Sequence, residues 1–238
     1  MNSKQKPSGL SRLKHSRAVR PVIPVVRLVR RASRRGPKRA RRELVRIRAR
    51  ARNVWWPRLR GRPTIPPPHA YKESVVLACA RRFGLRLFIE TGTLHGDMVE
   101  ATRDAFEHVW SIELDEALWK AAVERFRAYP QVSIVHGDSA TALPEIVRDQ
   151  AQPILYWLDG HWSGGVTARG SLDTPLLAEL TTILARGNAN DAVLIDDARL
   201  FGTGDYPSLK QVAGMVAARQ PTWKVEARDD IVRVHRPG

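Results

Sequence analysis

Short apolar runs alternate with amphipathic segments from about residue 70 to the end of the chain. Runs of about five residues rich in Val, Ile and Leu predict buried strands, and the longer segments between them predict helices. We expect strands at 86–90, 108–113, 132–136, 154–158 and 192–196. We expect helices at about 71–83, 97–106, 115–128, 139–149, 173–186 and 207–219. This alternation is typical of a parallel sheet with crossover helices.

The last residues predict a hairpin. Two short apolar runs lie between Trp223 and His235, on either side of Arg228-Asp229-Asp230. A strand from the end of the chain is therefore expected to insert antiparallel to the others. The fold class predicted for residues 70–238 is α/β: a doubly wound, Rossmann-like sheet of seven strands, mostly parallel, with the last strand antiparallel.

The first part of the chain has a different pattern. Residues 1–36 mix Lys and Arg with Ser, Pro and Gly and show no apolar period, which predicts disorder. Apolar residues then recur at helical spacing among arginines, so an amphipathic helix is expected at about 38–55. Prolines at 63–69 predict a linker. We therefore expect a basic arm (1–62), a linker (63–69) and a folded domain (70–238).

Charge separates the arm from the domain. Residues 1–62 hold 22 Lys and Arg against the single acid Glu43, about +21, whereas the rest of the chain is at about −5. Such an arm is expected to bind polyanions weakly and in a salt-dependent way, either nucleic acid or an anionic membrane surface. Its composition also resembles an organellar transit peptide. Its longest apolar stretch, Pro21–Val26, is too short to span a membrane, and we expect a cytoplasmic protein.

The single cysteine, Cys79, lies in an apolar run and has no second cysteine with which to form an internal disulfide. A lone thiol in such a run is more often buried packing than a nucleophile.

Candidate chemistry follows the predicted strands, because ligands of open α/β sheets bind beyond the carboxyl ends of the strands. After the first strand comes Glu90-Thr-Gly-Thr-Leu-His-Gly96, where Gly92 and Gly96 allow a tight turn and close backbone approach. The glycine spacing differs from the dinucleotide signature, which disfavours NAD. The loop also lacks the Gly-Lys-Ser/Thr of a Walker A phosphate loop.

Acids also follow the next two strands, Glu113 after the second and Asp138 after the third. Carboxylates at these places can accept hydrogen bonds from ribose hydroxyls and from an adenine amino group. A single acid after a strand is usually a helix cap, a role for which Asp115 and Ser139 are also candidates. Acids at three successive strand ends after a glycine turn favour a ligand site.

Residues 86–238 resemble the class I S-adenosylmethionine-dependent methyltransferases, whose first loop runs acid-x-Gly-x-Gly-x-Gly. Leu94 replaces the middle glycine. The terminal hairpin also resembles the reversed last strand of that family. The resemblance implies S-adenosylmethionine as cofactor, S-adenosylhomocysteine as product, and a set of cofactor-binding residues. These are Glu90, Gly92, Thr93, Gly96, Glu113, Asp138 and Ser139.

Three more acids follow the fourth and fifth strands: Asp159, Asp196 and Asp197. Such a cluster either raises a pKa or binds a hard cation such as Mg²⁺. The arrangement resembles the metal-dependent O-methyltransferases that act on sugars and catechol-like hydroxyls, which implies that these acids hold Mg²⁺ beside the acceptor. Alternatively, the pair after the fifth strand caps a helix or binds a backbone amide.

Two loops complete the candidate site. His161, two residues beyond Asp159, is a candidate general base, and Asp159 is the second catalytic candidate. A histidine in a glycine-flanked loop is also often a surface residue. Residues 163–170 contain three glycines and predict a lid, and 199–206 could close the other side of the pocket with Phe201 and Tyr206, which are equally compatible with packing.

The first functional hypothesis is therefore an S-adenosylmethionine-dependent O-methyltransferase that acts on a small molecule or sugar with Mg²⁺. The alternative is an RNA methyltransferase or RNA-binding protein whose arm captures nucleic acid. The acidic domain and the lack of an Asn-Pro-Pro-Tyr type motif count against base methylation. A catalytically inactive relative is a third possibility. The acceptor and the oligomeric state stay open.

Overall fold

The computed structural model describes residues 64–160 and 174–237. The predictions for the arm at 1–62, for His161 and for the lid at 163–170 lie outside the described residues. Within the described part, the predicted architecture is confirmed.

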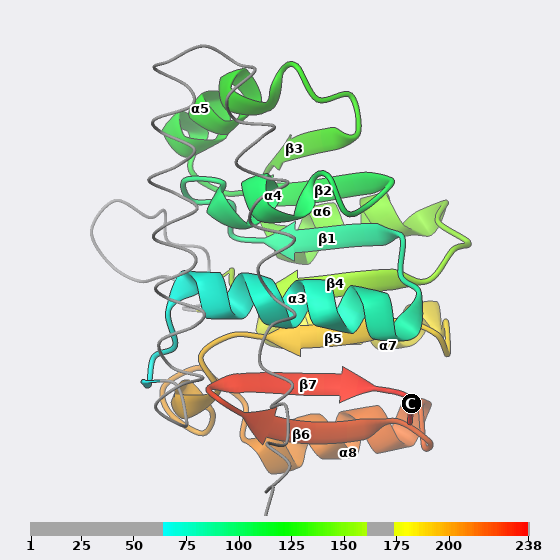
Figure 1. The fold of residues 1–238 in the computed structure, drawn as a ribbon. Coiled ribbons are helices and arrows are strands. Elements are labelled where there is room, and N and C mark those ends of the chain that lie inside the picture. Colours follow the sequence, from blue (N-terminus) through cyan, green and yellow to red (C-terminus); the bar gives the residue numbers. More distant parts are fainter. Residues whose placement is uncertain (1–63, 161–173, 238) are drawn as a thin grey trace, which may run out of the picture. The chain divides into compact units, whose positions relative to one another are not determined.

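The domain is built on one seven-stranded sheet (Figure 1). Its strands are β1 (Leu87–Thr91), β2 (His108–Glu113), β3 (Val132–His136), β4 (Ile154–Leu158), β5 (Ala192–Ile195), β6 (Lys224–Arg228) and β7 (Ile231–His235). The order across the sheet is β3-β2-β1-β4-β5-β7-β6. The first five strands are parallel, and β7 runs antiparallel to both β5 and β6. The strand order reverses between β1 and β4, which is where open α/β sheets bind ligands.

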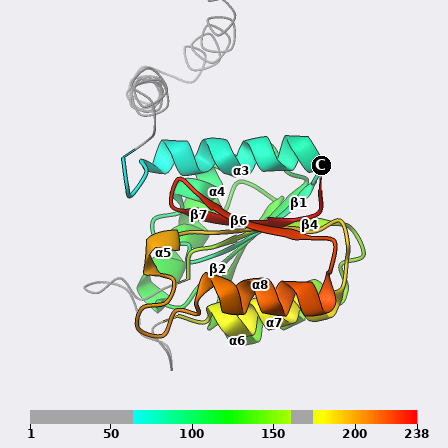
Figure 2. The same ribbon diagram turned by 90° about the horizontal axis from the view of Figure 1, so that it is seen from below.

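Helices cover both faces of the sheet (Figure 2). They are α3 (His69–Phe83), α4 (Asp97–Thr102), α5 (Glu116–Phe126), α6 (Ser139–Arg148), α7 (Leu176–Arg186) and α8 (Leu209–Arg219), with a short 3₁₀ helix η1 (Ala198–Leu200). α3, α4 and α5 lie on one face, and α6, α7 and α8 lie on the other. None of the described helices is both long and apolar enough to cross a membrane.

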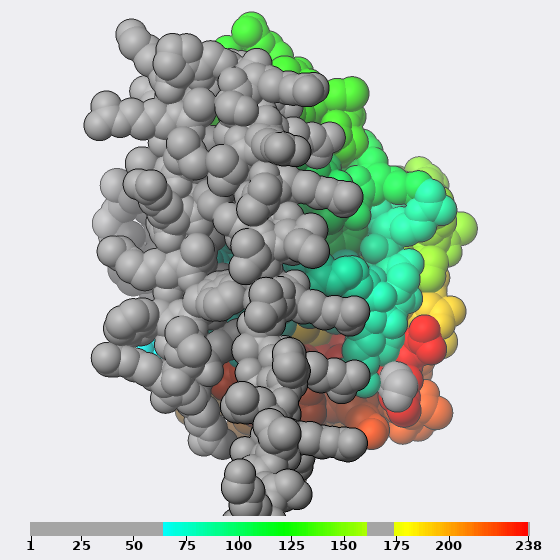
Figure 3. All heavy atoms as spheres, viewed as in Figure 1, coloured from blue at the N-terminus to red at the C-terminus, as the bar shows by residue number. Residues whose placement is uncertain are grey.

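The core has two layers because successive side chains of a strand point to opposite faces. In β1, Leu87 and Ile89 pack toward α6, α7 and α8, whereas Phe88 packs toward α3, α4 and α5. Both β1 and β4 are buried along their whole length. This explains why the central strands read as continuous apolar runs. Figure 3 shows the same order of elements at the surface, where the coloured atoms run from green at the top to red and orange at the bottom.

Several helix ends differ from their predictions by one to four residues, and three cases show a local reason or a later start. α4 ends at Thr102, not near 106, because Ala105 N donates to Thr102 O and turns the chain, so that Phe106 is buried and stacks on Phe88. α7 begins at Leu176 rather than 173. α8 begins at Leu209, where Ser208 forms a capping box.

The predicted terminal hairpin is confirmed. Asp229 and Asp230 form a two-residue turn between β6 and β7, with φ of 53° and 64°. Positive φ at both turn residues matches the twist of the flanking strands. Each carboxylate has a partner: Asp229 accepts from the Tyr71 hydroxyl, and Asp230 accepts from Arg199 N at 2.8 Å. The turn is therefore fastened to α3 on one side and to the segment after β5 on the other.

Cys79 packs against the core layer that contains α3. Burial raises the pKa of its thiol to about 11, so the neutral form dominates at physiological pH. A neutral thiol is a poor nucleophile, which supports the packing interpretation.

Candidate functional site

The acids that follow the strands lie along one edge because the ladder continues past the strand ends. Asp159 N donates to Thr91 O at 3.1 Å, Asp196 N to Leu158 O at 3.0 Å, and Gly137 N to Glu113 O at 2.9 Å. Each acid-bearing loop is thus tied by its backbone to the neighbouring strand. The edge predicted from the sequence is present in the structure.

A buried polar chain lies under the glycine loop. The Ser111 hydroxyl donates to Glu90 Oε2 at 2.6 Å and lies 2.6 Å from Thr93 Oγ1. All three residues are buried. Burial raises the pKa of Glu90 well above its ordinary value, the Ser111 hydrogen bond opposes this, and Asp159 and Glu113 add to it. Glu90 supports the loop from below through the Ser111 and Thr93 hydroxyls.

Glu113 connects the end of β2 to the glycine loop. Its Oε2 accepts from Leu94 N at 2.7 Å, and its Oε1 accepts from Asp115 N at 2.9 Å. The carboxylate is 6% exposed, and its orientation is fixed by two backbone amides. Each carboxylate oxygen can accept a second hydrogen bond. These acceptors suit the hydroxyl pair of a ribose, and the ribose contact of Glu113 stays a prediction.

Both loop glycines are required by contacts within the chain. A Cβ atom at Gly92 (φ 84°) would lie 2.5 Å from the backbone oxygen of Asp159. A Cβ atom at Gly96 (φ 70°) would lie 2.6 Å from the ring of Phe126. L side chains rarely adopt this backbone conformation. The predicted turn role of these glycines is therefore supported by their positive φ, and close packing of the loop is a second requirement for them.

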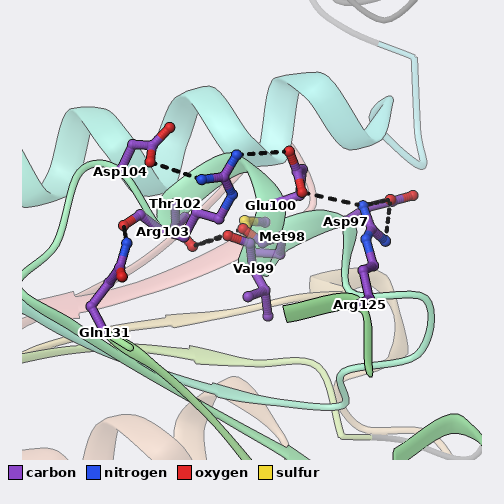
Figure 4. A network of polar contacts seen from close by, with 9 residues as sticks. All are labelled: Asp97, Met98, Val99, Glu100, Thr102, Arg103, Asp104, Arg125 and Gln131. Atoms are coloured by element: carbon purple, nitrogen blue, oxygen red, sulfur yellow. Dashed lines mark hydrogen bonds and ion pairs between the residues drawn. The ribbon is translucent and has the colours of Figure 1, made fainter. Parts of the chain in front are cut away.

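Arg125, at the end of α5, holds the far side of the glycine loop (Figure 4). Its guanidinium donates to the backbone oxygen of His95 and lies 3.3 Å from Asp97 Oδ1 and 3.7 Å from Glu100 Oε2. Arg103 also pairs with Glu100, at 3.1 Å. Sequence reasoning missed Arg125, because nothing in a helical pattern indicates a contact 30 residues away.

Two strand-end acids are helix caps. Asp115 accepts from Leu118 N at 2.9 Å at the start of α5, as expected. At the start of α6 the cap is Asp138, which accepts from Ala140 N at 2.9 Å. The expectation that Ser139 caps this helix is therefore wrong, since Ser139 is its first residue. The cofactor contacts assigned to Asp138 and Ser139 stay predictions.

A pocket opens where β4 and β5 end, beside the start of α7. It is lined by Leu158, Asp159, Gly160, Thr174, Leu176, Glu179, Ile195, Asp196 and Tyr206. The structure thus brings together Asp159 and Asp196, two of the predicted site residues. Tyr206 lines the pocket, which is one of the two alternatives predicted for the segment 199–206. Phe201 packs beside Tyr206, and their ring centres are 5.9 Å apart. His161 lies outside the described residues.

Glu179 is a pocket residue that sequence reasoning missed. It lies in the first turn of α7 and is 1% exposed, and its Oε1 has no hydrogen-bond partner within the described part of the chain. Burial raises the pKa of Glu179 to about 7. The hydroxyls of Ser139 and Thr91 oppose this rise. In sequence it reads as one polar position of an amphipathic helix.

Two basic side chains bind the acids that follow β5. The Lys72 ammonium, from α3, pairs with Asp196 Oδ2, while Asp196 Oδ1 accepts from Asp197 N at 2.9 Å. Arg199 Nη1 lies 2.7 Å from Asp197 Oδ1. Burial raises the pKa of Asp196 above its usual range, with a further contribution from Asp159, and Lys72 opposes the rise. The contact between Asp196 and the Asp197 amide agrees with the alternative prediction that this pair of acids binds a backbone amide.

The predicted Mg²⁺ site is not confirmed. Among residues 64–160 and 174–237 no group of three or more His, Cys, Asp or Glu side chains is placed to hold a metal ion. Asp196 and Asp197 are instead engaged by Lys72 and Arg199.

Known proteins of solved structure share this architecture. No model of a protein family and no curated protein matches the chain. Among solved structures, the O-methyltransferase TomG of Streptomyces achromogenes, in complex with S-adenosylmethionine, is 17% identical with a TM-score of 0.51, covering 71% of this chain and 81% of its own. An O-methyltransferase of Bacillus cereus in complex with S-adenosylhomocysteine is 15% identical with a TM-score of 0.51, covering 70% and 81%.

A third solved structure covers more of the chain. A putative caffeoyl-CoA O-methyltransferase from Staphylococcus aureus is 14% identical with a TM-score of 0.50, over 90% of this chain and 99% of its own. At such identities the likeness concerns the fold. The chain thus has the fold of the class I S-adenosylmethionine-dependent methyltransferases.

Proposed function

We propose that this protein is an S-adenosylmethionine-dependent methyltransferase that methylates a hydroxyl group of a small molecule or sugar. The observation that carries the proposal is Glu113. This acid is fixed by two amides at the end of β2, beside a glycine loop that starts at the reversal point of the sheet. Each of its oxygens can accept a second hydrogen bond, which suits a ribose, and the acid-lined pocket at the ends of β4 and β5 suits a hydroxyl-bearing acceptor.

Three regions of the edge would hold the cofactor. Glu113 would accept hydrogen bonds from the ribose hydroxyls, the loop from Gly92 to Gly96 would pass along the methionine part, and Asp138 would accept the adenine amino hydrogen. S-Adenosylmethionine supplies a methyl group on a positively charged sulfur. The rigidity of the loop matters here, because Arg125 on one side and the Glu90 chain below it fix the loop before any ligand arrives.

The pocket determines the acceptor chemistry. Asp159, Glu179, Asp196 and Tyr206 all line it. Carboxylates accept hydrogen bonds, so the pocket favours acceptors that donate them, as hydroxyl groups do. Asp159 is the proposed general base, since it follows the central strand β4 beside the glycine loop and can take the hydroxyl proton.

Mg²⁺ does not fit the carboxylates as they are arranged. This ion requires nearly octahedral oxygen coordination. Both oxygens of Asp196 have partners, and Arg199 binds Asp197 and also Asp230. The proposed mechanism therefore contains no step through a metal ion.

Transfer of tritium-labelled methyl groups into fractionated cell extract tests the proposal. We expect label in small, nuclease-resistant products. Asp159→Asn should lower the transfer rate by about a hundredfold, the usual contribution of a general base, without changing the affinity for S-adenosylhomocysteine. The exposed Asp149→Asn provides a matched control. An absence of transfer into every fraction would refute the proposal.

The basic arm supports a second candidate, an RNA methyltransferase or RNA-binding protein. Residues 1–62 carry about +21, and counterion release favours their binding to nucleic acid. An anionic membrane surface would attract the same charge. In the extract experiment this candidate predicts labelled products that nuclease digests, with transfer that falls steeply as salt increases. Label confined to nuclease-resistant products would reject it.

A further inference from the structure

A lysine from the helix that precedes the sheet reaches the acids that follow β5. Lys72 lies in the first turn of α3, and its ammonium pairs with Asp196 across 124 residues of sequence. The side chain of Lys72 is 14% exposed, and that of Asp196 is 1% exposed. Asp159 and Asp197 also act electrostatically on this ammonium. One partly buried positive charge therefore contacts Asp196 and interacts electrostatically with the other two carboxylates predicted to hold Mg²⁺.

The start of α3 is held in place by its own contacts. Figure 1 shows α3 beginning on the side of the sheet to which β1, β4 and β5 point. The Tyr71 hydroxyl donates to Asp229 in the hairpin turn, and Val76, one turn further on, is fully buried in the core. Lys72 follows Tyr71 directly, so its position is set by the packing of the helix and by the hairpin.

A second basic residue, Arg199, binds the neighbouring acids. Arg199 binds Asp197 at 2.7 Å and reaches Asp230, whose Oδ1 accepts from Arg199 N at 2.8 Å. Asp196 lines the pocket, and its Oδ2 is the atom that contacts Lys72. A divalent ion bound by these acids would have to displace the ammonium or lie against it, and like charges repel strongly where water is excluded.

We propose that the Lys72 ammonium is the resident cation of the Asp159, Asp196 and Asp197 cluster and takes the place of a divalent metal ion. An ammonium has three hydrogen-bond donors. One is directed to Asp196, and we assign another to the acceptor oxygen. Lys72 is then a binding residue for the acceptor. This last role rests on the proposed function, whereas occupation of the cation position does not.

Titration with Mn²⁺, followed by electron paramagnetic resonance, tests the cation position without any turnover. The full-length protein should bind no stoichiometric Mn²⁺. Lys72→Met should bind one Mn²⁺ ion at least about tenfold more tightly than the wild type does. Lys72→Met combined with Asp196→Asn should no longer bind that ion. Lys120→Met, which removes an exposed lysine paired with Glu116, should behave as the wild type.

Two results would overturn the proposal. One is stoichiometric Mn²⁺ binding by the wild type that Asp196→Asn abolishes. The other is a folded Lys72→Met protein, verified by circular dichroism, that still binds no ion, because then something other than the lysine excludes the metal. Binding of S-adenosylhomocysteine, measured separately, reports on the proposed function, so the two failures are distinguishable.

Methyl transfer adds a second readout. Wild-type transfer should be unchanged by EDTA, Lys72→Met should lower kcat/KM for the acceptor by about a hundredfold, and Lys72→Arg should retain a larger share of the activity because it keeps the charge. Loss of wild-type transfer in EDTA, with recovery on addition of Mg²⁺, would contradict the proposal.

Discussion

Glu179 carries the clearest thermodynamic prediction, because its carboxyl group is buried beside the pocket. It is 1% exposed, and Oε1 has no hydrogen-bond partner within the described residues. Burial, with smaller contributions from Asp138 and Asp159, raises the pKa of Glu179 from 4.5 to about 7. The perturbation we consider is Glu179→Gln, which keeps the shape of the side chain and removes its titration.

The magnitude follows from the two pKa values of Glu179. Between pH 4.5 and about 7 the folded protein holds a proton that the unfolded chain releases, so the free energy of unfolding falls as pH rises through this window. Above pH 7 both states are ionised and the loss is complete. The full loss is about 3 kcal/mol. The glutamine variant has no such titration. Its free energy of unfolding, relative to that of the wild type, should therefore rise by about 3 kcal/mol between acidic and mildly basic pH.

Urea unfolding of the full-length protein at pH 5, 6, 7 and 8 measures the effect. Buried Glu90 and Asp196 also have raised pKa values, so the difference between variant and wild type isolates Glu179. Glu145→Gln, which removes an exposed carboxylate paired with Arg148, is the matched control. If Glu179→Gln gains no more than this control between pH 5 and pH 7, the carboxyl is not buried as described.

Three further substitutions test the loop and the scaffold. Gly92→Ala would place a Cβ atom 2.5 Å from the backbone oxygen of Asp159 at a φ of 84°, so we expect urea unfolding to show a loss of about 2 kcal/mol or more. Arg125→Ala should weaken S-adenosylhomocysteine binding about tenfold in calorimetry, because the loop loses its outer support, whereas the exposed Arg127→Ala should not. Asp191→Ala removes the carboxylate that pairs with the buried Arg186 guanidinium, so thermal unfolding should show a free energy of unfolding lower by about 3 to 5 kcal/mol. Wild-type values for any of the three would contradict the corresponding contact.

The sheet was predictable because its signals are local. Strands such as β4 are continuous apolar runs, since both faces of the sheet are covered, and the turn at Asp229 and Asp230 separates two short runs. Acids that directly follow parallel strands must share one edge, so the candidate site could be inferred from order along the chain alone. Helix ends were less predictable. The turn after Thr102 depends on Phe106 finding a place in the core, which no local pattern reveals.

The partners of the acids could not be predicted, because they come from distant helices. Lys72 reads as one polar position in the first turn of a helix, and 124 residues separate it from Asp196. Arg125 and Glu179 lie in amphipathic patterns where most charged residues face solvent. The sequence therefore indicated the carboxylates and suggested Mg²⁺, while the cation that meets them in the structure is a lysine.

Isothermal titration of the full-length protein with S-adenosylhomocysteine tests the central claim most directly. We predict one bound molecule per chain and at least a tenfold loss of affinity in Glu113→Ala, because the ribose would lose its acceptor and the Leu94 amide its partner. Glu116→Ala, an exposed acid in the first turn of α5, should bind as the wild type does. No binding by the wild type, or equal binding by Glu113→Ala, would contradict the account.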